Sequence, residues 1–495
     1  MRVDRNCGVA YAGIMRVTWW LSLFLFCVAS DRPAAAQCPG DCDADARVSI
    51  DELVAAVGAS LNGCPAEGSP ARRCGPRGII TEPEVFKPSP TGPTQLGTVL
   101  QLNEAIYQAP GFGNTFMVVT SEGNVIIDTS IVLTAAAHKA ALKAIDAGTV
   151  RYIILTHAHA DHTGGVAMWK EAGTEVIAQR NHTQFQHYQR RLAPLFSYRN
   201  QAQFSVLLNL STLPPFAAPD APVVNDGGQI LATRLFDEFY EFKLGGLTFQ
   251  MLHTPGETPD HLTVWIPEYK IAFPGDNYYL SFPNLYTLRG TEPRRALEYV
   301  SSLDTVLSWN PEILAPSHGN PIYGRELIQA TVSNYRDAIQ YVHDKTVQGI
   351  NAGKDVHTLM QEVELPPEFP QSEVYGKIPW SVRGIYEGYL GWFDGNVSTM
   401  YETPARSVYP EVVALAGGPD VLAARAAALT AQGDPQRALH MADMALAADP
   451  ANLAALQAKR QAVVLLSETA VNLNELGWLK AALIEIDARL AAGTL

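Results

Sequence analysis

The chain has 495 residues, of which 47% are hydrophobic and 17% charged, and its formal net charge is −14. At roughly 150 residues per domain, this length predicts about three domains with sizeable cores. The composition excludes a polytopic membrane protein and a mostly disordered chain, and the acidic charge argues against a nucleic-acid partner.

Residues 1–36 have the pattern of a secretory signal. Arg16 precedes an apolar run at 19–29, and three alanines at 34–36 offer small residues for cleavage. The run is shorter than the ~20 residues that a bilayer span needs. We therefore expect a periplasmic or secreted protein with no membrane span after cleavage, with Met15 as an alternative start. The competing interpretation is a buried N-terminal helix.

Residues 37–64 contain a loop with the oxygen spacing of a calcium site. The side chains at loop positions 1, 3, 5, 9 and 12 belong to Asp41, Asp43, Asp45, Ser49 and Glu52. This segment resembles a single EF-hand or dockerin-type loop, and the resemblance implies bound Ca²⁺. Ala46 stands where that pattern has glycine, so a working site and a vestigial site both stay open.

The cysteines are confined to the first part of the chain, and the last of the six is Cys74. Four of them survive cleavage of the signal, and an oxidising compartment favours one or two disulfides, in any of three connectivities. Residues 65–94, which are rich in Pro, Gly and Arg, predict a linker.

From about residue 98 the pattern changes to α/β. The apolar runs 116–119 and 125–127, separated by a polar turn, predict a β-hairpin. Residues 134–146 have helical spacing, and residues 152–155 form an apolar run typical of a buried strand.

That strand is followed by four potential metal ligands within six residues: His157, His159, Asp161 and His162. The first two side chains lie two residues apart and point the same way, while the other two come one step later and can face a second ion. Imidazoles with an added carboxylate suit zinc in a catalytic site rather than a structural one. A polar turn with incidental histidines is the alternative interpretation.

This motif is that of the metallo-β-lactamase fold. The resemblance implies an αβ/βα sandwich over residues 95–323, in which loops at one edge of the sheets hold two metals. Further donors follow later apolar strand patterns, where the fold usually supplies them: Glu257, Asp276 and His318.

Most members of the fold have histidine at the position of Glu257, and a glutamate there resembles the alkylsulfatases, which hydrolyse sulfate esters such as dodecyl sulfate. In that branch a second acidic ligand follows 19 residues later, which is Asp276 here, although the family typically has glutamate. The segment 284–290 matches the family's Asn-Leu-x-Thr-Leu-Arg-Gly pattern. An arginine suits a tetrahedral oxyanion because its planar cation donates two parallel hydrogen bonds.

The resemblance implies seven ligands for two Zn²⁺ ions: His157, His159 and Glu257 at one ion, Asp161, His162 and His318 at the other, and Asp276 between them. It also implies that Asp276, Glu257 and Arg289 take part in catalysis, and that Asn284 and Arg289 bind the sulfate. His261, four residues after Glu257, is an alternative ligand in its place and is otherwise a supporting residue.

Residues 324–495 predict an all-α region. The run at 389–396 resembles the helical domain through which alkylsulfatases pair two subunits, although plain core aromatics are the alternative. Residues 417–490 are alanine-rich and repeat at tetratricopeptide-like spacing. Such an array usually binds protein, here most simply a second copy, which predicts a homodimer.

Taken together, these patterns predict an exported dizinc hydrolase that cleaves small anionic sulfate esters, most simply alkyl sulfates. Two other hypotheses stay open. One is a hydrolase of the same fold that acts on a phosphodiester, lactone or β-lactam. The other is a non-catalytic interaction protein with a vestigial metal site.

Overall fold

The computed structural model describes residues 98–212 and 232–493, all within one compact unit of the chain. The predicted signal segment 1–36, the calcium-type loop within 37–64 and the linker 65–94 lie outside the described residues.

The first sheet has seven strands in chain order: β1 (Leu100–Gln101), β2 (Ile106–Ala109), β3 (Thr115–Thr120), β4 (Gly123–Ile127), β5 (Val150–Ile154), β6 (Glu175–Gln179) and β7 (Arg234–Phe236). Strands β1 to β4 pair antiparallel, and β4 to β7 pair parallel. The β3–β4 hairpin and strand β5 are confirmed. The parallel pairs need crossover connections, and helix α3 (Val132–Ile145), also as predicted, supplies the first.

The second sheet has six strands in the order β13-β12-β11-β10-β9-β8: β8 (Phe239–Leu244), β9 (Leu247–His253), β10 (Leu262–Ile266), β11 (Ile271–Phe273), β12 (Ile313–Leu314) and β13 (Ile322–Tyr323). The β11–β12 pair is parallel, and the other pairs are antiparallel. The parallel connection contains helix α8 (Ala296–Ser308).

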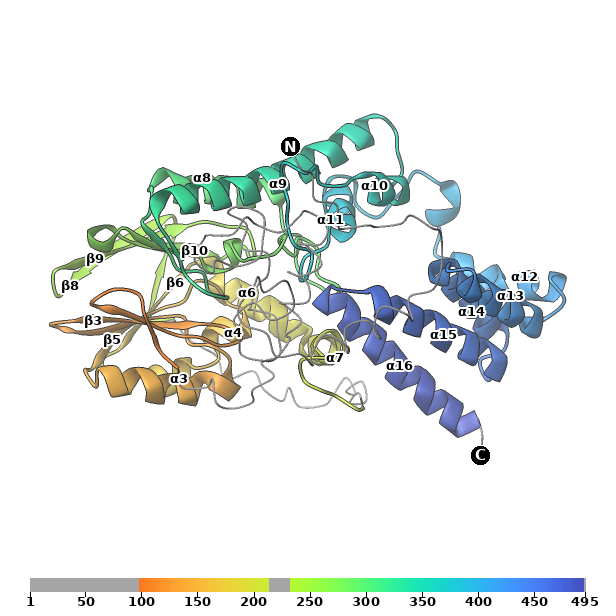
Figure 1. The fold of residues 1–495 in the computed structure, drawn as a ribbon, viewed down its shortest axis with the longest axis horizontal. Coiled ribbons are helices and arrows are strands. Elements are labelled where there is room, and N and C mark those ends of the chain that lie inside the picture. Colours follow the sequence, from red (N-terminus) through yellow and green to blue (C-terminus); the bar gives the residue numbers. More distant parts are fainter. Residues whose placement is uncertain (1–97, 213–231, 494–495) are drawn as a thin grey trace, which may run out of the picture. The chain divides into compact units, whose positions relative to one another are not determined.

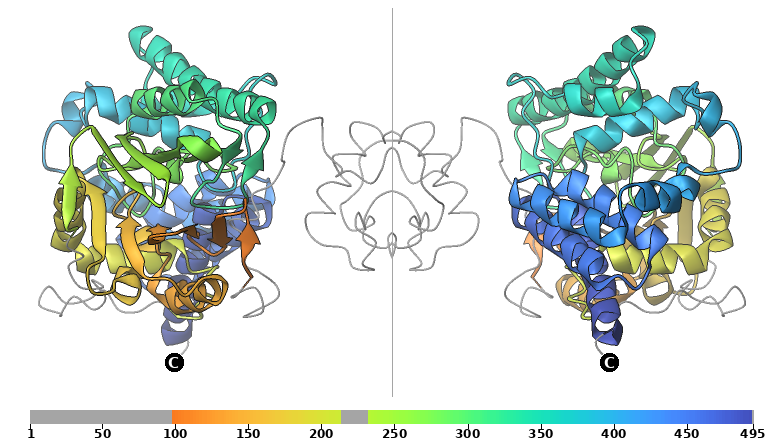
Figure 2. Two further views of the ribbon diagram at one scale, coloured as in Figure 1. Left: turned by 90° about the vertical axis from the view of Figure 1, so that its left-hand side faces the viewer. Right: turned by 90° about the vertical axis from the view of Figure 1, so that its right-hand side faces the viewer.

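The two sheets pack face to face through a buried apolar core (Figures 1 and 2). The rings of Phe116 in β3 and Phe273 in β11 meet across it with centroids 5.0 Å apart. Helix α3 covers the outer face of the first sheet, and α8 with α9 (Arg325–Asn351) covers the outer face of the second. Each helix buries one apolar face on a sheet, which gives the expected αβ/βα sandwich.

Every regular element described after β13 is helical, as predicted. The helices are α9, α10 (Val356–Glu362), α11 (Ile378–Leu390), the 3₁₀ turns Val397–Thr399 and Ala405–Val408, α12 (Tyr409–Leu415), α13 (Pro419–Ala431), α14 (Pro435–Ala448), α15 (Leu453–Thr469) and α16 (Leu473–Gly493). Buried alanines such as Ala426, Ala442 and Ala458 let α13, α14 and α15 pack closely.

Helix packing joins this helical region to the sandwich, and the segment 372–376 adds hydrogen bonds to Ser281 and Phe282. Residues of α9 and α11 share a core with Leu314 of the second sheet, and α16 packs against α7 (Ala193–Gln203), which follows α6 (Asn181–Arg191). Within the described ranges, no single helix has the length and apolar composition of a membrane span, although the bent pair 405–415 and 419–431 meets that test together.

Candidate metal centre and its pocket

The predicted metal ligands follow strand ends at one edge of the sandwich. The histidine motif follows β5, with α4 (Ala160–Thr163) beginning inside it, and Glu257 lies in the connection after β9. Asp276 and His318 come a few residues after β11 and β12. The structure brings all seven side chains together, because strand ends from both sheets meet at this edge.

Four side chains converge in the first donor group: Asp161, His162, Asp276 and His318, whose donor atoms all lie within 4.8 Å of one another. Oδ2 of Asp276 is 3.1 Å from Nε2 of His318 and 3.4 Å from Nε2 of His162. Among the described residues, neither Nε2 of His162 nor Oδ1 of Asp276 has a hydrogen-bond partner, although both are buried. Buried, convergent and unpaired donors of this kind fit a divalent cation.

The second donor group consists of His157, His159 and again Asp276. Nε2 of His157 is 2.9 Å from Nδ1 of His159 and 3.8 Å from Oδ2 of Asp276. Burial, followed by the charges of Arg289 and Arg294, holds the pKa of His159 well below its usual value. The imidazole is therefore neutral, which is the form that binds a metal.

Glu257 lies at the side of this second group, with Oε1 3.7 Å from Nδ1 of His159. Its other oxygen is already occupied. Nη1 of Arg294 and the hydroxyl of Tyr299 each donate to Oε2 at 2.6 Å, and all three side chains are buried. Arg294 Nη1 also donates to the carbonyl of Asn284. The carboxylate therefore has one fixed oxygen and one that faces the histidines.

Asp128 is a supporting residue that the sequence analysis missed. It is fully buried after β4 and accepts hydrogen bonds from the hydroxyls of Thr156 and Ser317 and from Nδ1 of His162. A carboxylate on Nδ1 fixes the tautomer that leaves Nε2 of His162 as a metal donor. The position of Asp128 directly after the buried strand β4 is the sequence feature that could have indicated this role.

The Asp128→Asn variant is expected to bind zinc about 10- to 100-fold more weakly, because the loss of a charged partner to a metal-binding histidine typically costs this much affinity. Competition with a chromophoric chelator measures the change. Asp146→Asn is the matched control, since Asp146 hydrogen-bonds Asn124 and the amide of Gly148, away from the donors. Equal zinc affinity in the Asp128→Asn and wild-type proteins would contradict the assignment.

His261, the alternative ligand, supports the site instead. Its Nε2 accepts a hydrogen bond from the backbone amide of Asp276, and its ring stacks on His157. Burial lowers the pKa of His261 to about 4, so the ring is neutral and able to accept. The side chain thus holds Asp276 in place, and that nitrogen is not available to a metal.

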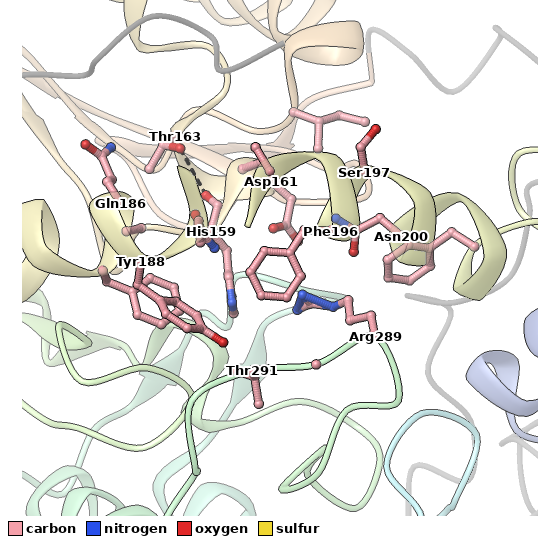
Figure 3. Close-up of a pocket in the computed structure, with 18 of the residues that line it drawn as sticks. His159, Asp161, Thr163, Gln186, Tyr188, Phe196, Ser197, Asn200, Arg289 and Thr291 are labelled. Atoms are coloured by element: carbon pink, nitrogen blue, oxygen red, sulfur yellow. Dashed lines mark hydrogen bonds between the residues drawn. The ribbon is translucent and has the colours of Figure 1, made fainter. Parts of the chain in front are cut away.

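A pocket of about 660 Å³ opens beside the donors. His159, Asp161 and Arg289 lie around it, with Tyr188 and Phe196 on the wall that α6 and α7 form (Figure 3). Its further apolar lining includes Phe112, Phe185, Phe204 and Leu208. The pocket therefore combines carboxylate and imidazole donors, two arginines (Arg190 and Arg289) and an aromatic wall.

The two predicted sulfate-binding residues are placed differently. Arg289 lines the pocket, and its Nε has no hydrogen-bond partner in the described part of the chain. Asn284 is buried and is not among the pocket-lining residues, and neither its Oδ1 nor its Nδ2 finds a partner within that part. The structure therefore puts the guanidinium, rather than the amide, in the pocket.

Comparison with known proteins gives two family matches. Residues 109–318 match the metallo-β-lactamase superfamily, and residues 355–486 match the alkyl sulfatase dimerisation domain.

Three kinds of relative are similar over most of the chain. A linear primary-alkylsulfatase from Pseudomonas sp. is 29% identical over 390 residues, which is 76% of this chain and 74% of the relative. The alkyl/aryl-sulfatase BDS1 of Saccharomyces cerevisiae is 26% identical over 377 residues, which is 72% of this chain and 58% of the relative. The solved sec-alkylsulfatase Pisa1 from Pseudomonas sp. superposes with a TM-score of 0.70 at 21% identity, covering 79% of this chain and 66% of that one.

The chain thus spans less than two thirds of the yeast relative and of the solved structure. Over the part they share, both the sandwich and the helical region have counterparts. The chain therefore carries a metallo-β-lactamase fold followed by an alkyl sulfatase dimerisation domain, and alkylsulfatases are among its homologues.

Proposed function

We propose that the protein is a zinc-dependent hydrolase that cleaves sulfate esters, most simply alkyl sulfates, to an alcohol and sulfate. The observation that carries the proposal is the position of Arg289 in one pocket with the two donor groups. The alkylsulfatase homologues support the same substrate class.

The donor sets fit two zinc ions that share Asp276. His157, His159 and Glu257 would hold one ion, and Asp161, His162 and His318 would hold the other. When bound, zinc supplies Lewis acidity and activates water at neutral pH. Nε2 of His162 and Oδ1 of Asp276, which have no hydrogen-bond partner in the described part of the chain, are the atoms that support this assignment most directly.

The chain's own residues divide the work of binding the ester. Arg289 donates parallel hydrogen bonds to the sulfate oxygens, and its fixed positive charge binds the anion. The aromatic wall, with Phe185 and Phe196, receives the apolar part of the ester and excludes water from it. An anionic head beside Arg289 and an apolar tail against this wall describe an alkyl sulfate.

Arg294 compensates the negative charge that Glu257 adds to the metal site. A glutamate ligand makes the site more anionic than a three-histidine site, which disfavours binding an anionic ester. The buried guanidinium, 2.6 Å from Glu257, offsets that charge without entering the pocket. The positive charge required by the substrate is therefore supplied locally, in a protein whose formal net charge is −14.

We further propose a homodimer that forms through the dimerisation domain. Large apolar side chains are exposed on the segment between α11 and α12, including Trp392 at 73% and Tyr401 at 65%. Burial of such a patch against a second copy removes apolar surface from water. Export to the periplasm or the medium, supported by the pattern of residues 1–36, completes the proposal.

Sulfate release from dodecyl sulfate by zinc-loaded protein tests the function. Arg289→Ala is expected to lower kcat/KM about 100-fold or more. Arg289 is partly buried in the free protein, the bound ester would cover it, and truncating one partner of a buried, hydrogen-bonded charge pair costs roughly 2–5 kcal/mol. His159→Ala should lose activity together with zinc. Arg295→Ala is the matched control for Arg289→Ala, since Arg295 is 78% exposed and should behave as wild type.

Two outcomes would overturn the proposal. The first is turnover of a phosphodiester, lactone or β-lactam with none of any sulfate ester. The second is no turnover of these substrates by a protein that binds no zinc, which would favour a non-catalytic interaction protein.

A further inference from the structure

Arg289 is held in place by a residue on a different element. Its backbone amide donates to Oε1 of Gln203 at 2.8 Å, and Nε2 of the same glutamine donates to the hydroxyl of Thr287 at 3.2 Å. Gln203 is fully buried at the end of α7, and Thr287 is buried as well. One side-chain amide thus fixes the backbone at the arginine and the side chain two residues before it.

A second α7 residue holds the same stretch. Nη2 of Arg199 donates to the carbonyl of Leu288, the residue between the two that Gln203 contacts. The guanidinium of Arg199 in turn lies 5.3 Å from the ring centre of Trp478 in α16. Helix α7 therefore contacts three consecutive residues, 287–289. Helix α16 contacts α7 at Arg199, one of the two α7 residues that make these contacts.

The packing of α16 on α7 is unusually close at Gly477. A Cβ at this position would lie 1.8 Å from the carbonyl oxygen of Gln203, so only glycine fits without a shift. The hydroxyl of Ser205 donates to the Gly477 carbonyl at 2.8 Å, and Nζ of Lys480 donates to the Ser205 carbonyl at 3.2 Å. The backbone of α16 therefore touches the backbone of the residue that holds Arg289.

We propose that Gln203 is the positioning residue for Arg289, and that α16 keeps Gln203 in place. The anion-binding part of the pocket is then built jointly by the sandwich and by a helix within the region matched to the dimerisation domain. The role of Arg289 in this inference rests on the proposed sulfatase function. The contacts themselves are independent of the metal donors, because Gln203, Thr287 and Gly477 belong to neither donor group.

Positioning of this kind has a specific kinetic signature. A shift of about 1 Å in a group that positions the substrate can cost about 100-fold in rate. Because Arg289 would bind the sulfate group, we expect the loss to appear in the binding of sulfate esters and of sulfate ion. Gln203→Met keeps the approximate volume of the side chain and removes its hydrogen bonds to Arg289 and Thr287. We expect KM for a sulfate ester to rise about 10-fold with a smaller change in kcat, and the inhibition constant of inorganic sulfate to rise by the same factor.

The decisive experiment is a double-mutant cycle between Gln203→Met and Arg289→Ala, read out by sulfate-ester kinetics and by calorimetric binding of sulfate ion. If Gln203 acts through Arg289, Gln203→Met adds little in the Arg289→Ala background. Thr287→Val removes the other hydrogen-bond partner of Gln203 and should raise KM, as Gln203→Met does. Gln329→Met is the control, since Gln329 hydrogen-bonds the Leu307 carbonyl away from the pocket and its loss should leave KM unchanged.

Zinc content and thermal unfolding are measured for every variant. Additive effects of the two substitutions, or unchanged sulfate binding in both Gln203→Met and Thr287→Val, would overturn the inference. A wild-type protein that binds sulfate ion but turns over no sulfate ester would overturn the proposed function alone, because the binding cycle still tests the role of Gln203.

Discussion

The Asp276→Ala variant is expected to lose zinc from both donor groups and to retain about 0.1% of the wild-type activity or less. Asp276 is the one residue common to the two groups, and its Oδ2 lies 3.1 Å from His318 and 3.8 Å from His157. Its removal therefore weakens both sites at once, whereas loss of any other donor directly affects one. A 1000-fold loss corresponds to about 4 kcal/mol of transition-state stabilisation.

Metal content by mass spectrometry and zinc-dependent thermal stabilisation measure this effect separately from activity. Zinc that binds only the folded state raises its stability, so the wild type should gain thermal stability on zinc addition and the variant should gain little. Asp304→Ala, which removes a half-exposed carboxylate paired with Arg336, is the matched control. An Asp276→Ala protein with two tightly bound zinc ions would contradict the shared role.

The conservative variant Asp276→Glu tests the point at which Asp276 departs from the pattern that the sequence resemblance implies. The resemblance of the sequence to the alkylsulfatases implies a glutamate at this position, and an aspartate side chain is shorter by one methylene. A glutamate keeps the carboxylate between the two groups, so Asp276→Glu is expected to retain more zinc and more activity than Asp276→Ala.

The metal donors could be predicted from sequence because each lies just after an apolar strand pattern. His157 follows β5, Asp276 follows β11 and His318 follows β12, and strand ends that meet at one edge place such residues together. A run of imidazoles and carboxylates separated by alanines is also hard to explain by core packing. Local pattern and residue chemistry both indicated the site.

The supporting residues could not be predicted in the same way. Arg294, Tyr299 and Gln203 are ordinary residue types on helices or loops, and nothing in their local sequence distinguishes them from surface or core residues. Their roles come from long-range contacts, such as the close approach of Gly477 to Gln203. Only the tertiary arrangement brings these positions together.

The boundary between sandwich and helices illustrates the same limit. The end of the strand pattern at residue 323 predicts where the all-α region begins, since periodicity is a local property. It does not predict that α9 and α11 share a core with Leu314, or that α16 packs on α7. Packing between apolar faces that are far apart in the sequence depends on their complementary shapes, which cannot be inferred from a single sequence.

Removing the contact between Arg294 and Glu257 is expected to have a large effect on the stability of the folded protein. In zinc-free protein, Arg294→Met is expected to lower the free energy of unfolding by about 3–5 kcal/mol, since removal of one partner leaves a buried charge uncompensated. Glu257 is only 4% exposed, and among the described residues Tyr299 would remain as the one donor to its Oε2. Burial already raises the pKa of Glu257, against the opposing effect of Arg294, so the carboxylate depends on this partner.

Urea unfolding of the zinc-free variants measures the loss. The double variant Arg294→Met with Glu257→Gln removes both charges, and it should recover about half of the deficit because an uncharged amide needs no counter-charge. Arg295→Met, one residue along and exposed, is the control and should unfold as wild type does. If Arg294→Met unfolds at the wild-type urea concentration, the guanidinium does not compensate Glu257, and the charge argument for an anionic substrate loses its support.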